Sequence, residues 1–129
     1  MGQSLTPSPP PPNNGPPDMG NSLIKETIDA MAEALFTQAK SKGFWDLERN
    51  KGEQIALMHS ELSEALEAIR SGNPKDDHLP FLDSLTVEMA DCIIRILDFC
   101  GGYNLPIGTA IVEKIRYNMR RPFKHGTEF

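Results

Sequence analysis

The sequence contains little cysteine, and its two cysteines are badly placed to pair. Cys92 and Cys100 are eight residues apart on one expected helix. That spacing separates them by about 12 Å along the helix axis, which is too far for a disulfide. Both lie among apolar residues, so we expect two buried thiols. A chain without a disulfide framework suits a reducing compartment, and we expect a cytoplasmic protein.

Long apolar runs and an excess of basic residues are also missing. No stretch approaches the roughly 20 apolar residues that span a bilayer, and the N-terminus lacks the charged and apolar regions of a secretory signal. Lys and Arg number 13 against 18 Asp and Glu, which gives a net charge of -5. This balance argues against binding of a DNA or RNA backbone, so we expect neither nucleic acid nor membrane as a partner. A phosphorylated small molecule stays compatible, because a bound divalent cation can reverse the local charge.

Large apolar side chains are almost absent from residues 1–20, where most of the 11 prolines are found. Such a segment buries too little surface to fold, so we expect a disordered, Pro-rich tail at 1–20. Residues 21–129 then form one folded domain. A domain of this size has a small core and gains stability from association with copies of itself.

Helical periodicity dominates the rest of the chain. Apolar residues recur every three to four positions in four segments, and no segment alternates with the period of a strand. Gly43, the pair Gly101 and Gly102, and Pro122 are expected to end helices. We therefore predict an all-α fold, a four-helix bundle. Its helices are expected at about 22–42, 52–70, 80 or 81 to 100, and 106–120.

Two pairs of carboxylates carry the functional prediction. Glu61 and Glu64 are three residues apart on the second expected helix, and Glu88 and Asp91 have the same spacing on the third. Residues at i and i+3 project from the same face of a helix. If the two helices pack side by side, four carboxylates meet, and their repulsion requires a cation between them. Oxygen ligands of this kind favour Mg²⁺, Mn²⁺ or Ca²⁺ over zinc.

The surroundings of these acids differ from those of ordinary surface pairs. On a helical wheel Glu61 falls inside the apolar arc of its helix, and Glu64 lies at the border of that arc. The third helix is apolar around most of its circumference, and its polar residues form one narrow stripe: Ser84, Glu88, Asp91, Arg95 and Asp98. A solvated stripe with an Asp91–Arg95 ion pair is the simpler interpretation. A helix this apolar is buried on several sides, however, so its stripe should face a cleft or a partner.

With these residues in place, the sequence resembles a known family. Glu-x-x-Glu, then 23 residues, then Glu-x-x-Asp is similar to the metal motif of the all-α nucleoside triphosphate pyrophosphohydrolases. These are the MazG-like proteins, related to the dimeric dUTPases and the dCTP pyrophosphatases. Segments 43–46, 55–67 and 113–122 also resemble these proteins, and the resemblance covers about residues 22–125.

The resemblance implies both a reaction and a metal site. Members of the family hydrolyse nucleoside triphosphates between the α- and β-phosphates, which gives a monophosphate and pyrophosphate. By resemblance, Glu61, Glu64, Glu88 and Asp91 are catalytic and hold Mg²⁺, or Mn²⁺ in its place. Glu64 is the first candidate for the base that takes a proton from water. Family members are oligomeric, with the substrate pocket near the subunit contact. The apolar third helix agrees, so we expect a homodimer or a dimer of dimers.

Other residues are candidates for binding the nucleotide. Lys114, Asn118 and Arg121 share a face at the end of the fourth expected helix and would clamp the triphosphate, as the matching Lys and Asn do in the family. The alternative is a basic helix end that only complements the helix dipole. Trp45 would either stack on a nucleobase or close the core, and Phe44 is expected in the core.

Two other functions compete with the enzyme. A carboxylate-bridged di-iron site requires Glu-x-x-His on two helices, and the sequence contains no such motif. A non-catalytic oligomerisation or regulatory module with the same fold stays open, although the presence of all four acids favours the enzyme. The sequence does not identify the preferred nucleotide.

Overall fold

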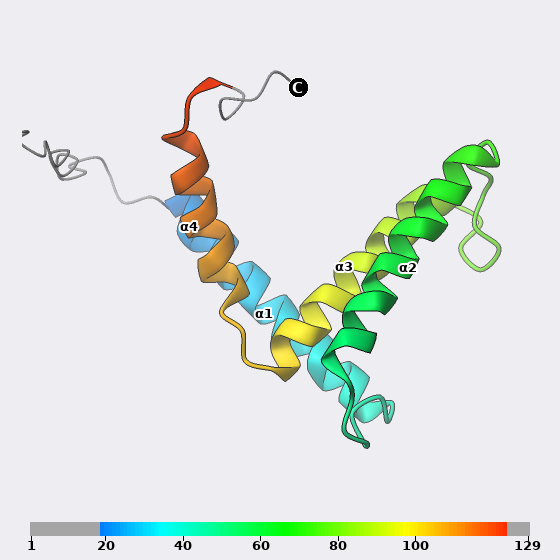
Figure 1. Ribbon diagram of the computed structural model, residues 1–129, viewed down its shortest axis with the longest axis horizontal. Coiled ribbons are helices and arrows are strands. Elements are labelled where there is room, and N and C mark those ends of the chain that lie inside the picture. The colour runs from blue at the N-terminus through cyan, green and yellow to red at the C-terminus, as the bar shows by residue number, and fades with distance from the viewer. Residues whose placement is uncertain (1–18, 124–129) are drawn as a thin grey trace, which may run out of the picture.

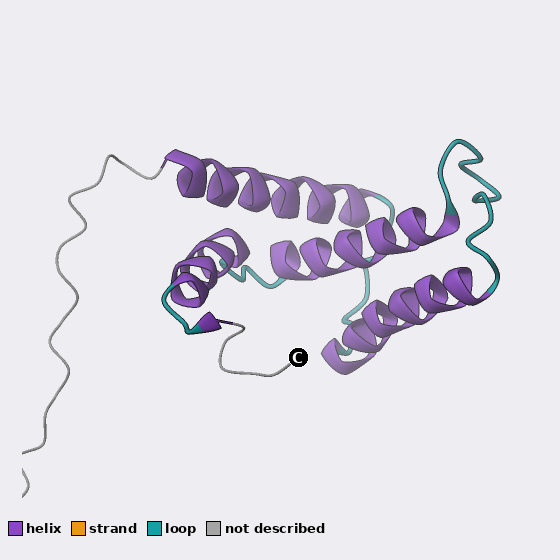
Figure 2. Cartoon of the chain, turned by 90° about the horizontal axis from the view of Figure 1, so that it is seen from above, coloured by secondary structure: helices purple, strands orange, loops and turns teal. Residues whose placement is uncertain are grey.

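The fold is described by a computed structural model over residues 19–123. Within that range it has four helices and no strand (Figures 1 and 2): α1 (Met19–Ser41), α2 (Lys51–Arg70), α3 (Ser84–Gly102) and α4 (Ile107–Met119). The prediction of an all-α chain with four helices is confirmed. The expected tail lies outside the described residues up to residue 18, but Met19 and Gly20, which we had assigned to it, begin α1. The last proline of that stretch is Pro17, so no proline interrupts a helix that starts at residue 19.

The helices are arranged as the two arms of an open V (Figure 1). α3 packs against both α2 and α1, and α1 also packs against α4. One arm therefore consists of α2 and α3, and the other consists of α4 and the first half of α1. A closed four-helix bundle is not formed by this arrangement within one chain, because α2 and α4 lie in different arms.

Side chains cap the first turns of two helices, α2 and α3. Asn50 and Asp83 each cap a helix by accepting a backbone N–H three residues further on, at 3.1 and 2.8 Å. The cap at Asp83 places the start of α3 at Ser84, three to four residues later than we predicted. Gly43 follows α1 in the left-handed conformation with a φ of +86°, so its predicted role at a helix end is confirmed.

Gly101 and Gly102 have a different role from the one we predicted. We expected them to end the third helix, but both belong to the last turn of α3. A Cβ atom at Gly101 would collide with the backbone oxygen of Ala32 on α1, and one at Gly102 would collide with the ring of Trp45. The two glycines therefore allow α1 and the α1–α2 loop to approach α3 closely.

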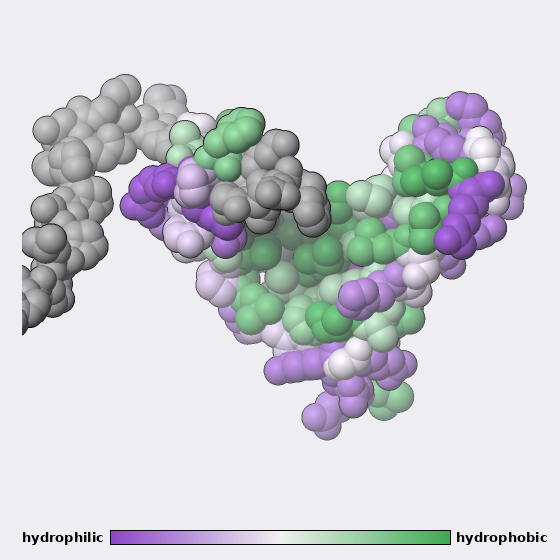
Figure 3. All heavy atoms as spheres, turned by 45° about the horizontal axis from the view of Figure 1, so that its top comes forward, coloured by the Kyte–Doolittle hydropathy of each residue, from purple (hydrophilic) through white to green (hydrophobic). Residues whose placement is uncertain are grey.

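The core is small, and much apolar surface stays outside it. The buried apolar residues are Ala32, Ala65, Ala68, Cys92, Leu97, Cys100 and Val112. Burial of both cysteines is as predicted. Several large apolar side chains of α2 and α3 are exposed: Leu62, Leu66, Ile69, Met89, Ile93 and Ile94. Figure 3 shows extensive apolar surface between the two arms. None of the described helices combines the length and the apolar character required to cross a bilayer.

Candidate metal centre

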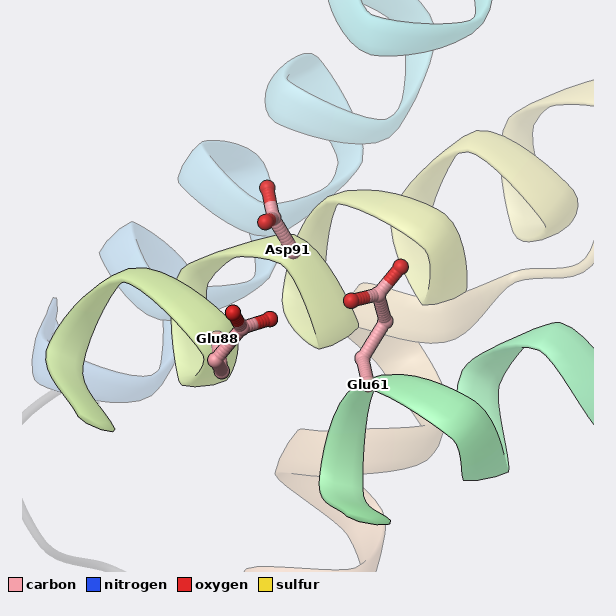
Figure 4. Close-up of side chains that lie close together, drawn as sticks. All are labelled: Glu61, Glu88 and Asp91. Carbon is pink, nitrogen blue, oxygen red and sulfur yellow. The ribbon is translucent and has the colours of Figure 1, made fainter. Parts of the chain in front are cut away.

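Packing of α2 against α3 brings three carboxylates together. Glu61 comes from α2, and Glu88 and Asp91 come from successive turns of α3. One oxygen atom from each carboxylate lies within 4.8 Å of the other two. In Figure 4 the carboxylates of Glu61 and Glu88 face each other across the gap between the helices. The two i, i+3 pairs thus lie on facing helices, as the sequence predicted.

Burial of Glu61 follows from the face that α2 presents to α3. Ala65 and Ala68, which lie one and two turns further along α2, are buried on the same face. Their small side chains let the two helices come close, so the longer Glu61 side chain is enclosed and the residue as a whole is only 7% exposed. The predicted position of Glu61 inside the apolar arc is therefore confirmed, and Glu64 is exposed, as expected at the border.

Burial and neighbouring acids raise the pKa of two carboxyl groups of the cluster, Glu88 and Asp91. Burial, followed by the neighbouring carboxylates of Glu64 and Glu61, raises the pKa of Glu88 to about 7. Burial and the charge of Glu61 also raise the pKa of Asp91. Glu64 lies outside the group of three but close enough for its charge to act on Glu88. Near neutral pH the cluster therefore requires either a proton or a cation.

One cation from the chain itself already contacts the cluster. Nε of Arg95 donates a hydrogen bond of 2.5 Å to Oε1 of Glu61. Burial raises the pKa of Glu61, but the hydrogen bond and charge of Arg95, together with hydrogen bonds to Glu64 and Glu88, lower it below its usual value. The sequence suggested pairing of Arg95 with Asp91 on the same helix. The bond instead crosses to α2, and the position of Arg95 on the acidic stripe was the only signal for it.

The donor set fits a hard divalent cation. Two oxygen ligands of one Mg²⁺ ion lie at most about 4.2 Å apart, twice the usual 2.1 Å bond. At most one pair among three ligands of an octahedral ion can be that far apart, and the other pairs lie about 3 Å apart. The oxygen atoms of the cluster, within 4.8 Å of each other, would therefore move together by up to about 2 Å to share one ion. Three carboxylates and the nearby Glu64 also carry more negative charge than Arg95 alone can neutralise.

Trp45 lies against the end of α3, where its indole ring contacts an aspartate and two aromatic rings. Its Nε1 donates a 2.9 Å hydrogen bond to Asp98, and its ring packs edge-on against Phe36 and Tyr103, with centroid distances of 5.1 and 5.3 Å. Burial raises the pKa of Asp98, against the lowering effect of this bond. These contacts match the core role that we considered for Trp45, and they hold the α1–α2 loop on α3.

Phe44, which we expected in the core, is 64% exposed, so that prediction is wrong. Only one of two adjacent side chains can turn inward at this bend. The space left by Gly102 is taken by the ring of Trp45, and Phe44 therefore points to solvent. A second residue also joins this region, since the buried Gln54 accepts a 2.6 Å hydrogen bond from the hydroxyl of Tyr103.

Two of the candidate phosphate-binding residues, Lys114 and Asn118, lie on α4 in the other arm, and Arg121 follows the end of that helix. Lys114 and Asn118 line an open hollow of about 470 Å³ together with Ala110, Ile111 and Ile115. Oδ1 of Asn118 is buried and has no hydrogen-bond partner among the described residues. The ammonium of Lys114 lies 4.7 Å from the ring centre of Tyr117, and the guanidinium of Arg121 lies 5.8 Å from it. One chain alone does not bring these residues to the acids, because α4 packs on α1 (Figure 1).

No family model, curated protein or solved structure matches this chain. The family resemblance seen in the sequence therefore stays a prediction. Function has to be inferred from the acids on α2 and α3, from the cation beside them and from the polar residues on α4.

Proposed function

We propose that the protein is a Mg²⁺-dependent nucleoside triphosphate pyrophosphohydrolase of the MazG-like kind. The observation that carries the proposal is the meeting of Glu61, Glu88 and Asp91 across two helices, with oxygen atoms within 4.8 Å. Acids at this spacing on facing helices are the arrangement that the sequence motif implies. The pKa of about 7 at Glu88 adds support, because it marks a site that is short of positive charge.

The four acids divide into ligands and a base. Glu61, Glu88 and Asp91 would hold the metal, since their oxygen atoms already converge. A bound Mg²⁺ ion, or Mn²⁺ in its place, supplies neutralisation of the triphosphate and a water molecule of lowered pKa. Glu64 is exposed beside the group of three, and we assign to its carboxylate the role of accepting the proton of that water.

The proposed reaction consumes only water and the nucleoside triphosphate. Water adds its oxygen to phosphorus, and the anhydride bond between the α- and β-phosphates breaks. One proton of the water passes to Glu64, and the products are a nucleoside monophosphate and pyrophosphate. Lys114 and Asn118 would bind the phosphates, the first through its charge and the second through its side-chain amide.

A second copy of the chain is part of the proposal. Within one chain α4 and the acids are in different arms (Figure 1), so a complete site needs α4 from elsewhere. The buried Oδ1 of Asn118, which has no partner among residues 19–123, is consistent with a surface that another molecule covers. The exposed apolar faces of α2 and α3 give a homodimer, or a dimer of dimers, apolar surface to bury.

The test is an assay of the purified protein with each common NTP and dNTP in the presence of Mg²⁺. Pyrophosphate should appear as the first product. Glu61→Gln should lower turnover at least tenfold, because loss of a metal ligand lowers activity more than loss of a residue that only contacts a ligand. Glu67→Gln is the matched control, since Glu67 is an exposed acid on the same helix. Orthophosphate as first product would contradict cleavage between the α- and β-phosphates. Absence of turnover with every nucleotide would favour the non-catalytic module.

A further inference from the structure

The contact between Arg95 and Glu61 joins a half-exposed cation to a buried anion. The side chain of Arg95 is 41% exposed and that of Glu61 is 9% exposed. The Nε–Oε1 bond is the only hydrogen bond that the side chain of Arg95 makes to a described residue. It is a single-point contact, and a two-point contact of guanidinium with carboxylate would be stronger. The two terminal nitrogens of Arg95 make no hydrogen bond to a described residue.

This contact occupies an atom of the candidate metal centre. Glu61 is one of the three acids whose oxygen atoms converge, and Arg95 takes one of its two oxygens. A divalent cation at the cluster would bring two positive charges next to the guanidinium, and like charges a few ångströms apart repel each other strongly. A doubly charged ion attracts the three acids more strongly than one half-exposed arginine does.

The released guanidinium has an evident destination. Arg95 lies one helical turn beyond Asp91 on the same stripe of α3. A triphosphate held at the acids would carry its charge within reach of that long side chain. Guanidinium groups bind phosphate oxygens through paired N–H donors, and the terminal nitrogens of Arg95 supply such a pair.

We propose that Arg95 is a displaceable counter-cation of this site. In the metal-free protein it neutralises Glu61, a divalent cation displaces it, and the freed guanidinium then binds the phosphates of the nucleotide. The inference rests on the metal centre of the proposed function. It makes Arg95 a substrate-binding residue that also sets the metal affinity.

Displacement can be followed directly in the wild-type protein. Arginine Nε–H signals are visible in nitrogen-15 NMR spectra, and Arg95→Lys assigns the signal of Arg95 by removing it. Addition of MgCl₂ should shift this signal and speed its exchange with water, while the signal of the exposed Arg70 should stay in place. An Arg95 signal that keeps its position and protection at saturating Mg²⁺ would overturn the proposal.

Metal affinity distinguishes displacement of Arg95 by the ion from a fixed role of Arg95 in orienting Glu61. Calorimetric titration with Mn²⁺ should show that Arg95→Gln binds the ion about tenfold more tightly, because a competing charge has gone. Arg95→Lys keeps that charge and should bind like the wild type. If Arg95 only oriented Glu61 as a fixed support, Arg95→Gln would bind Mn²⁺ more weakly, and that outcome would refute displacement. Should Arg95→Gln fail to fold, the wild-type NMR titration still decides the question.

The nucleotide provides the last readout. At saturating Mg²⁺, Arg95→Gln should raise KM about tenfold or more, the usual loss for a charge-assisted hydrogen bond. An unchanged KM would remove phosphate binding from the proposal. Mg²⁺ binding and Arg95 displacement without any nucleotide hydrolysis would contradict the proposed function and leave the displacement standing. Nucleotide hydrolysis with an Arg95 NMR signal that does not move would support the proposed function and contradict the displacement.

Discussion

The two arms of the V differ in what they bury. In the α2–α3 arm a glutamate and a glutamine are buried, and carboxylates from both helices meet. In the α1–α4 arm the buried residues of α4 are Gly108 and Val112, and the backbone N–H of Gly108 donates a 2.8 Å hydrogen bond to Asp29. Enclosing charges lowers stability unless they are paired. The first arm therefore contains the enclosed charged groups on which the proposed function depends, and the second arm holds α4 against α1.

The largest effect is expected in the first arm. Asp91→Asn should lower kcat/KM about 100-fold or more, because the substitution removes a ligand oxygen charge from the proposed centre. The thermal midpoint of the metal-free protein should not fall, since the substitution also removes repulsion from Glu61. Glu67→Gln serves as the control. Full activity of Asp91→Asn would show that the chemistry lies elsewhere.

The second prediction concerns whether α4 of one chain completes the site formed by the acids of another chain. Lys114→Ala should lower kcat/KM roughly 30-fold through loss of a charged phosphate contact. Co-expression of Lys114→Ala with Asp91→Asn should restore about a quarter of wild-type activity, because half of the dimers are mixed and one of their two sites is intact. Purification through two different tags isolates the mixed dimer. If the purified mixed dimer showed no restored activity, Lys114 and Asp91 of one site would have to come from the same chain.

A third prediction concerns the stability of the second arm. A Cβ atom at Gly108 would collide with the backbone oxygen of Lys25 and the carboxylate of Asp29. Gly108→Ala should therefore force α4 away from α1 and lower the free energy of unfolding by about 1–3 kcal/mol. Urea denaturation measures this change, and Thr109→Ala, at an exposed neighbouring position, is the control. Equal stability of both variants would show that α4 is only loosely attached.

The smallest effect is a dependence of stability on pH. The pKa of Glu88 is raised from 4.5 to about 7, so the folded protein binds this proton more tightly than the unfolded chain does. Stability of the metal-free protein should therefore fall as pH rises between these values, by a few degrees in the thermal midpoint at most. Mg²⁺ should cancel the fall, and Glu88→Gln should flatten the profile in EDTA. A midpoint that rises over this range would contradict the assignment.

Features that depend on local pattern were predictable. Helical periodicity gave the four helices, and the same wheel placed Glu61 on a buried face, because both follow from residues within a few turns of one another. The spacing of the acids likewise determined that each pair shares a face. The meeting of the four acids was an inference from packing, and the structure brings together three of them, Glu61, Glu88 and Asp91.

Features that depend on neighbouring elements were not predictable from the same patterns. Gly101 and Gly102 look like a helix end, yet their role depends on the closeness of α1 and Trp45. Phe44 and Trp45 are equally apolar neighbours, and only the space beside Gly102 decides which one turns inward. Arg95 had an acid one turn away on its own helix, but its partner proved to be Glu61 on the next.

The hydrogen bond from Trp45 to Asp98 makes the intrinsic fluorescence of the protein a probe of this region. Trp45 is the only tryptophan in the chain, so all indole fluorescence reports on this position. Its Nε1 is bonded to Asp98, whose pKa also responds to the charge of Arg95 one turn earlier on α3. Movement of that charge alters the electric field along the indole ring. Emission of the unlabelled protein should therefore change colour as the acid cluster fills, so that occupancy can be followed on the millisecond scale.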